Sequence, residues 1–142
     1  MTSNIRRLVL VRGLPGSGKT TIARMLIIAG MGSGERTICS ADDYFYRLPD
    51  GIYRFDKSKL SDAHNECQRV AFGAMNDGHS LVVVHNTFTT MWEMVPYLSI
   101  AKLHNYSIQV IECKCDFGSV HDVPAEVIDR MRNRWEEYDE QA

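Results

Sequence analysis

The sequence predicts an α/β domain, in which helices cover both faces of a mainly parallel sheet of about four to five strands. Apolar segments with strand character alternate along the chain with segments of helical character, and this alternation is typical of parallel sheets. The chain has 142 residues, of which 44% are hydrophobic. We therefore expect residues 1–142 to form one domain with a substantial core.

Local patterns define each expected element in turn. The expected strands are short apolar runs at residues 7–11, 35–40, 80–85 and 107–114. The expected helices are residues 19–30, 58–78, 91–105 and 124–138. In the second helix, apolar residues recur at three- and four-residue steps. Ser58 is expected to cap that helix and Gly78 to end it, while Pro124 suits the first position of the last helix.

Composition limits the class of protein. The formal net charge is −2, so any contact with nucleic acid must come from a local basic patch. No apolar run approaches the ~18–20 residues of a membrane span, and the first apolar run is too short for a secretory signal. The four cysteines match no zinc-binding spacing. We expect reduced thiols in a cytoplasmic protein, or a nuclear one in a eukaryotic or viral host setting.

A phosphate-binding loop follows the first expected strand. The stretch "GLPGSGKT", residues 13–20, matches the pattern G-x-x-x-x-G-K-S/T in full and begins an expected helix. Glycines let the backbone wrap around phosphates, and a helix N-terminus attracts their charge. We expect Lys19 at the β- and γ-phosphates of ATP and Thr20 at Mg²⁺. The residues expected to bind the nucleotide are Gly13, Pro15, Gly16, Ser17, Gly18, Lys19, Thr20 and Thr21.

Two adjacent carboxylates, Asp42 and Asp43, follow the second expected strand. Ligands of open parallel sheets bind beyond the carboxyl ends of the strands, so both lie at the expected site. Neighbouring side chains of an extended chain point to opposite sides, so we expect the two carboxylates to have different functions. One carboxylate would accept the proton of an attacking hydroxyl. The other would cap the local turn.

Aromatic and basic side chains share the segment after these carboxylates. The aromatics suit stacked bases and the cations suit phosphates of a single strand; the alternative is that the aromatics pack under a loop and the cations are solvated. The residues are Tyr44, Phe45, Tyr46, Tyr53 and Phe55, with Arg47, Arg54, Lys57 and Lys59.

The third expected strand ends in His85 and Asn86, where many enzymes with this loop carry a magnesium-binding aspartate. Because magnesium prefers oxygen ligands, we expect His85 to be a neutral hydrogen-bonding residue. Asn86 and Thr87 are expected to form hydrogen bonds near the phosphates.

These motifs, with "SADDYF" (40–45), "NT-x-T-x-x-W-E-M" (86–94) and "I-x-x-M-x-x-R-W-E" (128–136), resemble the polynucleotide-kinase-like family of P-loop kinases. That family includes the kinase-like domains of the Nedd-four-binding-protein-like ATPases and the 5′-kinase domain of phage polynucleotide kinase. The resemblance implies a P-loop-type three-layer α/β/α fold. It also implies Mg²⁺-dependent transfer of the γ-phosphate of ATP to a 5′-hydroxyl end of DNA or RNA, single-stranded for preference.

The resemblance also assigns residues. Asp42 becomes the general base, and Asn86 and Thr87 lie near the substrate. Phe45 falls where the family has a substrate-binding arginine, and Arg47, two positions on, is its expected substitute.

The chain departs from the family pattern at three places. His85 and Phe88 replace an acid and an amide, and no arginine lies between Lys114 and Pro124, where the family has a lid arginine. We expect an arginine of the closing helix to contact ATP instead; the candidates are Arg130, Arg132 and Arg134, of which Arg130 and Arg134 are preferred. Two alternatives stay open: a kinase for a small alcohol or nucleoside, and an ATP-binding module with little transfer activity.

Overall fold

The structure is a computed structural model that describes residues 5–30, 34–46, 48–118 and 121–141. Arg47 lies outside these residues, so its expected contact with a substrate stays a prediction. Among the described residues, no helix is both long enough and apolar enough to cross a membrane.

Four parallel strands form the sheet, in the order β2-β3-β1-β4. They are β1 (Arg7–Arg12), β2 (Arg36–Cys39), β3 (Leu81–Asn86) and β4 (Ser107–Glu112). Val9 in β1 pairs with Val83 in β3 and with Gln109 in β4. The expected parallel sheet is therefore confirmed, and β1 occupies an interior position from which its following loop can reach both neighbours.

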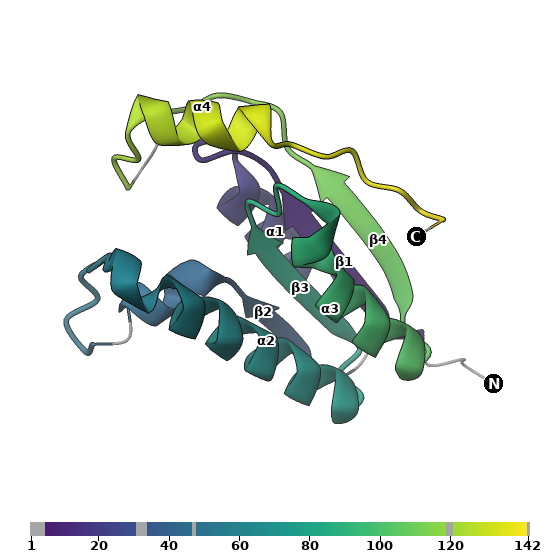
Figure 1. Ribbon diagram of the computed structural model, residues 1–142. Helices are drawn as coiled ribbons and strands as arrows, with labels where there is room; N and C mark the ends of the chain where they lie inside the picture. The colour runs from purple at the N-terminus through teal and green to yellow at the C-terminus, as the bar shows by residue number, and fades with distance from the viewer. Residues whose placement is uncertain (1–4, 31–33, 47, 119–120, 142) are drawn as a thin grey trace.

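Helices cover both faces of this sheet, as expected (Figure 1). Helices α2 (Leu60–Asn76) and α3 (Met91–Leu103) lie on one face, and α1 (Lys19–Ala29) lies on the other. Alternate residues of β1 serve the two cores: Leu8 and Leu10 pack in the α2–α3 core, while Val9 and Val11 pack in the α1 core. Each fully buried aliphatic side chain of this kind contributes about 1.5–3 kcal/mol.

Two short 3₁₀ helices connect β2 to α2. The first, η1 (Ala41–Tyr46), directly follows β2, and the second, η2 (Lys57–Lys59), directly precedes α2. Ala41 and Phe45 are buried against Ala63 of α2. The cap of this region differs from the expected one, because the side chain of Asp56, not Ser58, accepts the hydrogen bond at the helix start.

The closing helix is shorter than the predicted 124–138. Helix α4 spans Ala125–Asn133, and Pro124 is its N-cap residue rather than its first helical residue. The chain leaves the helix because its next residues are held elsewhere: Trp135 stacks on Arg12, and the Glu136 backbone N–H donates to the carbonyl of Thr89 (2.8 Å). Figure 1 shows α4 near the end of the sheet where the strands finish.

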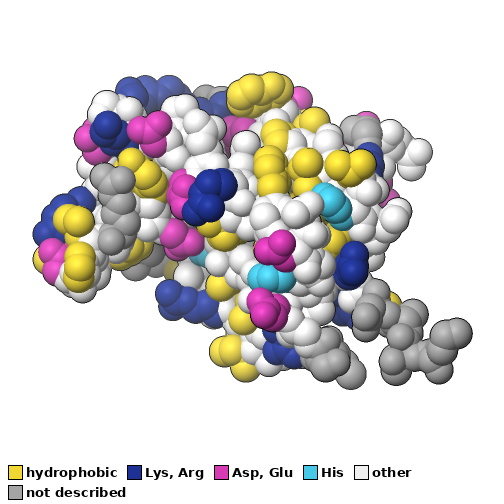
Figure 2. All heavy atoms as spheres, turned by 90° about the horizontal axis from the view of Figure 1, so that it is seen from below, with side chains coloured by type: hydrophobic (Ala, Val, Ile, Leu, Met, Phe, Trp, Pro, Cys, Tyr) yellow, Lys and Arg dark blue, Asp and Glu magenta, His cyan; other side chains and the backbone are white. Residues whose placement is uncertain are grey.

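The opposite end of the molecule carries a mixed surface. Figure 2 shows acidic and basic side chains intermixed on this face, with hydrophobic side chains in small groups between them. This mixture agrees with the formal net charge of −2. The described side chains of that face therefore create no single-sign field that would attract a polyanion.

Candidate active site

The phosphate loop connects β1 to α1 through a tight glycine-dependent path. Gly16 and Gly18 have φ angles of 82° and 95°, which favour glycine. A Cβ atom on Gly13 would lie 2.7 Å from the carbonyl oxygen of Cys113, so the end of β4 excludes a side chain there. Gly18 gives α1 no side-chain cap, which leaves the first N–H groups of the helix available to an anion.

Ser17 and Lys19 provide polar groups at this loop. The Ser17 hydroxyl is buried and has no hydrogen-bond partner among the described residues. Lys19 Nζ donates to the carbonyl of Leu14 (2.9 Å). Burial lowers the Lys19 pKa to about 8, and the charge of Asp42 acts against that shift. An unpartnered donor, a partly desolvated cation and an uncapped helix start fit the oxygen atoms of a triphosphate.

Asp42 projects from η1 toward the phosphate loop. Its carboxylate is about half exposed, at 52%, and its charge reaches both Lys19 and His85. The Tyr53 hydroxyl donates to Asp42 Oδ1 (3.0 Å), and His121 Nε2 lies 3.7 Å from Asp42 Oδ2. The structure thus brings together a carboxylate and the lysine of the phosphate loop, from two different strand ends.

Asp43 has the structural contacts expected of the second carboxylate. It accepts hydrogen bonds from the Ser40 backbone N–H (2.9 Å) and the Ser40 hydroxyl (3.3 Å). These bonds close the turn between β2 and η1. The two adjacent carboxylates therefore have different surroundings: Asp43 holds the turn, and Asp42 faces the loop.

Asn86 and Thr87 support the same region from the end of β3. Asn86 Oδ1 accepts from the Ala41 backbone N–H (2.8 Å), and its Nδ2 donates to Cys67 Sγ (3.7 Å). Both ends of this buried amide are thus used within the protein. The Thr87 carbonyl accepts from the Gly13 backbone N–H (3.3 Å), which joins β3 to the start of the phosphate loop.

His85 lies in β3, next to its last residue, Asn86. Burial lowers its pKa, while the charges of Asp43 and Asp42 oppose the shift. The imidazole is therefore neutral at pH 7, as the sequence predicted. Among the described residues, no cluster of three or more histidine, cysteine or acidic side chains could hold a metal ion. Thr20, at the exposed start of α1, stays the predicted Mg²⁺ contact.

The aromatic residues near Asp42 divide into a buried and an exposed group. Phe45 is only 5% exposed and contacts Tyr44 and Tyr53 edge-to-face. Phe45 therefore supports Tyr53 from beneath and does not offer a ring to a ligand. Tyr46 and Phe55 are 41% and 54% exposed. The packing interpretation is therefore confirmed for Phe45, and stacking on bases stays a prediction for the exposed rings of Tyr46 and Phe55.

The arginines of the closing segment differ in their surroundings. Arg134 Nε donates to the Thr89 hydroxyl (3.0 Å), and Arg130 is exposed on α4. Arg132, although it pairs with Asp129, borders a cavity of about 250 Å³ that also contacts Leu14 and Ser17 of the phosphate loop. Of these three arginines, Arg132 is the one that shares a cavity with the loop.

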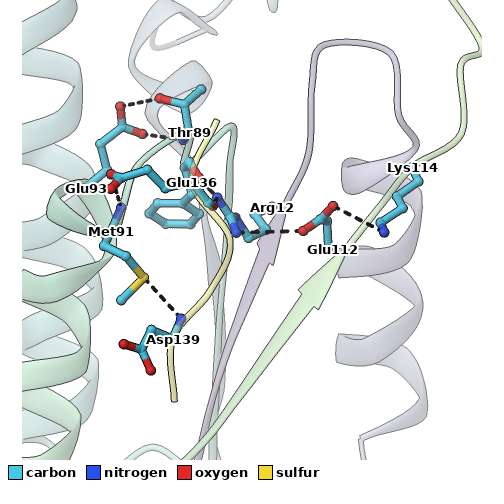
Figure 3. Close-up of polar contacts among 9 residues, drawn as sticks. Arg12, Thr89, Met91, Glu93, Glu112, Lys114, Glu136 and Asp139 are labelled. Atoms are coloured by element: carbon cyan, nitrogen blue, oxygen red, sulfur yellow. Dashed lines mark hydrogen bonds and ion pairs between the residues drawn. The ribbon is translucent and has the colours of Figure 1, made fainter. Parts of the chain in front are cut away.

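Sequence reasoning missed a buried arginine directly before the loop. Arg12, at the end of β1, is fully buried. Its guanidinium donates to the Phe88 carbonyl (3.0 and 2.6 Å) and the Glu136 carbonyl (2.7 Å), and Glu112 lies 3.7 Å away (Figure 3). Burial lowers the Arg12 pKa. The only local signal was an arginine at the end of an apolar strand, which alone does not indicate burial.

The fold and this site define a class of protein. A phosphate loop follows an interior strand of a parallel sheet, and a carboxylate stands at the end of a nearby strand; this is a P-loop kinase-like α/β fold. The family described as "AAA domain" matches residues 8–120, and the chain belongs to this family.

Known relatives agree with this class. The chain is 34% identical over 140 residues to human NEDD4-binding protein 2, a match that covers 92% of this chain but 8% of the relative. A structure of the Pnkp1/Rnl/Hen1 complex has a similar fold, with a TM-score of 0.58 and 18% identity over 92% of this chain and 40% of the other. The APS kinase CysC of Mycobacterium tuberculosis, in complex with AMPPNP and APS, gives a TM-score of 0.52 and 17% identity over 89% of this chain and 68% of the other.

Proposed function

We propose that this protein is an ATP-dependent polynucleotide kinase that phosphorylates 5′-hydroxyl ends of DNA or RNA. The observation that carries the proposal is the position of Asp42, whose charge opposes the burial that lowers the pKa of Lys19 in the phosphate loop. A carboxylate that is half exposed stands close enough to the loop lysine for its charge to act on the lysine pKa. A nucleotide-binding module without transfer activity needs the lysine but has no use for the carboxylate.

The proposed reaction is a single displacement. The substrate 5′-hydroxyl donates a hydrogen bond to Asp42, which takes the proton as the oxygen attacks the γ-phosphorus of ATP. The bond between that phosphorus and the β–γ bridging oxygen breaks, and ADP leaves. Lys19 and the first N–H groups of α1 stabilise the negative charge on the phosphates. Mg²⁺, when bound beside the Thr20 hydroxyl, would neutralise part of the same charge.

The surface beside Asp42 supports a nucleic-acid acceptor. Tyr46 and Phe55 expose aromatic rings, and Lys57 and Lys59 are exposed cations in the same segment. Stacked bases and phosphates of a single strand suit such a surface. In this proposal Arg47 and Thr87 contribute to substrate binding, while Arg132, beside the loop cavity, joins Arg130 and Arg134 as candidate contacts to ATP.

A small alcohol is the second candidate acceptor. The specific observation in its favour is the similar fold of an APS kinase, whose structure contains AMPPNP and APS. That acceptor is a small molecule. Asp42 would accept the proton of its hydroxyl and Lys19 would contact the ATP phosphates, as for a 5′-hydroxyl.

Label transfer from γ-labelled ATP separates these candidates. The protein is incubated with Mg²⁺ and 5′-hydroxyl oligonucleotides of DNA and RNA, and in parallel with nucleosides and APS. The proposal predicts label on the oligonucleotides, its loss in Lys19→Ala, and no label on oligonucleotides that already carry a 5′-phosphate. Label on a small alcohol alone would favour the second candidate, and ATP binding without transfer would contradict both.

A further inference from the structure

We infer that Tyr53 and His121 are positioning residues for Asp42. Their side chains come from segments far apart in the chain, and each contacts one oxygen of the Asp42 carboxylate. The inference rests on the proposed function, because it concerns the same carboxylate. It gives both residues a role at this carboxylate that the sequence did not predict.

The contacts divide between the two carboxylate oxygens. The Tyr53 hydroxyl donates to Oδ1 at 3.0 Å, and His121 Nε2 lies 3.7 Å from Oδ2. The rings of Tyr53 and His121 stack on each other, with centroids 3.8 Å apart and planes 22° apart. A half-exposed aspartate would otherwise sample several rotamers. These contacts restrict the Asp42 carboxylate to one orientation. In it, Oδ1 accepts from Tyr53, and Oδ2, which His121 approaches only to 3.7 Å, can accept a hydrogen bond from the substrate hydroxyl.

Tyr53 is held in place from its other side. The buried Phe45 ring contacts it edge-to-face at 5.9 Å, and Phe55 stacks near it at 6.4 Å. The Arg54 backbone N–H donates to the Phe45 carbonyl at 2.9 Å. Contacts therefore run from the core that Phe45 forms with Ala41 and Ala63, through Tyr53, to Asp42. The buried Phe45 supports the site by packing against Tyr53.

His121 lies four positions after a residue that contacts the phosphate loop. It belongs to the segment between β4 and α4, in which the Phe117 backbone N–H donates to the Gly16 carbonyl (2.7 Å). A Cβ atom on Gly18 would lie 3.2 Å from the Phe117 ring. Phe117 thus contacts the phosphate loop, and His121, four positions further along the sequence, contacts Asp42.

The raised pKa of Tyr53 keeps its hydroxyl protonated, so that it can donate a hydrogen bond. Burial raises the Tyr53 pKa, and the charge and hydrogen bond of Asp42 raise it further, with a smaller contribution from Tyr46. The phenol is therefore protonated across the neutral range, and Asp42 receives its hydrogen bond whenever Asp42 is ionised. Besides His121 beside it, the charge of Asp42 acts on the titratable groups Lys19, His85 and His64.

The test is steady-state kinetics of 5′-hydroxyl phosphorylation in Tyr53→Phe, which removes only the hydroxyl, and in His121→Phe, which replaces the imidazole with an apolar ring. Because small errors in position cost up to ~10²-fold in rate, we expect Tyr53→Phe to lower kcat about 10-fold or more, with the KM for ATP within about 2-fold of the original. His121→Phe should lower kcat less, since the stacking remains. Tyr106→Phe is the matched control, because the hydroxyl of Tyr106, just before the start of β4, donates to the His79 carbonyl (2.6 Å), and it should leave kcat unchanged.

Two further results make the test specific to positioning. In an Asp42→Asn background, Tyr53→Phe should have no further effect on kcat, because coupled residues are not additive. In NMR titrations of labelled tyrosine, Asp42→Asn should lower the Tyr53 pKa whether or not the protein is a kinase.

The outcomes separate failure of the inference from failure of the proposed function. Full activity in Tyr53→Phe with active starting protein would overturn the inference and leave the proposed function standing. Absence of transfer by the unaltered protein, with ATP still bound, would overturn both. A Tyr53 pKa that is unchanged by Asp42→Asn would show that the contact itself is absent in solution.

Discussion

Arg12 lies beneath Trp135, with its guanidinium carbon 4.0 Å from the centre of the indole ring. The pair joins the end of β1, directly before the phosphate loop, to the segment that leaves α4. The same guanidinium donates to the carbonyls of Phe88 and Glu136 (Figure 3). One buried cation thus binds three parts of the chain beside the loop.

Removal of this cation should destabilise the fold. Arg12→Met leaves two carbonyls without their donor and removes a cation–π contact, so we expect the free energy of unfolding to fall by about 2–4 kcal/mol. Urea denaturation measures this difference. Arg12→Lys should recover little, because an ammonium cannot reproduce the fork of the guanidinium. The control is Arg69→Met on the surface of α2, whose pair with Glu66 is exposed and contributes little to stability.

Gly13 should tolerate no side chain. Gly13→Ala brings a Cβ atom to 2.7 Å from the Cys113 carbonyl oxygen, and we expect a loss of about 1–3 kcal/mol in stability together with weaker ATP binding. Gly73→Ala is the matched control. Gly73 lies within α2, and a Cβ atom there meets nothing within 4 Å among the described residues, so this change should stabilise the protein by about 0.5–1 kcal/mol. Equal destabilisation by both changes would contradict this account of the loop.

ATP affinity should fall as the pH rises through about 8, the pKa of Lys19 in the folded protein. Above this pH the folded protein loses the ammonium that attracts the phosphates. Calorimetric titration between about pH 7 and 9, to either side of that pKa, measures the change in Kd. The substitution Lys19→Arg should remove the pH dependence, because a guanidinium keeps its charge. An affinity that is constant across this range in the unaltered protein would contradict the lowered pKa.

The lowered pKa of Lys19 should also make the stability of the folded protein rise with pH, whereas the ATP affinity falls. That pKa is lower in the folded protein than its ordinary value of 10.5, so the unfolded chain binds more protons between these two pH values. Stability therefore rises with pH over this window. Lys19→Met should increase the free energy of unfolding at pH 7 and flatten this rise, in thermal denaturation without nucleotide. A variant that is less stable than the original at pH 7 would show that the lysine is not a desolvated cation.

Asp43→Asn should act on stability more than on catalysis. The amide can accept one hydrogen bond from Ser40 but cannot reproduce both charge-assisted bonds, so we expect a loss of about 1 kcal/mol. Transfer activity at a temperature where the variant is folded should fall less than in Asp42→Asn. A larger fall in Asp43→Asn would show that the base is assigned to the wrong carboxylate.

The sequence predicted the layers and the loop because their signals are local. A phosphate loop is a contiguous motif, and strands buried on both faces appear as apolar runs such as that of β1. Adjacency predicted different surroundings for Asp42 and Asp43, although both lie in the 3₁₀ helix η1 and not in the extended chain on which that reasoning rested. The contacts of Asp43 with Ser40 agree with that prediction.

The remaining features depend on contacts between distant segments. Arg12 and Glu136 are 124 positions apart, and no periodicity of α4 reveals that a buried arginine ends the helix at Asn133. Likewise, Tyr53 and His121 meet at Asp42 only after the chain folds. The predicted role of Phe45 rested on a family position, whereas its burial depends on packing against α2.

The rate of phosphate transfer to a 5′-hydroxyl oligonucleotide in Asp42→Asn tests the central claim most directly. A general base contributes about 10²–10⁴-fold, so transfer at saturating ATP should fall by that factor while the Kd for ATP stays within about 2-fold. Asp77→Asn, at the far end of α2, is the matched control and should transfer at the original rate. Transfer by Asp42→Asn at the rate of the unaltered protein would contradict the role of this carboxylate.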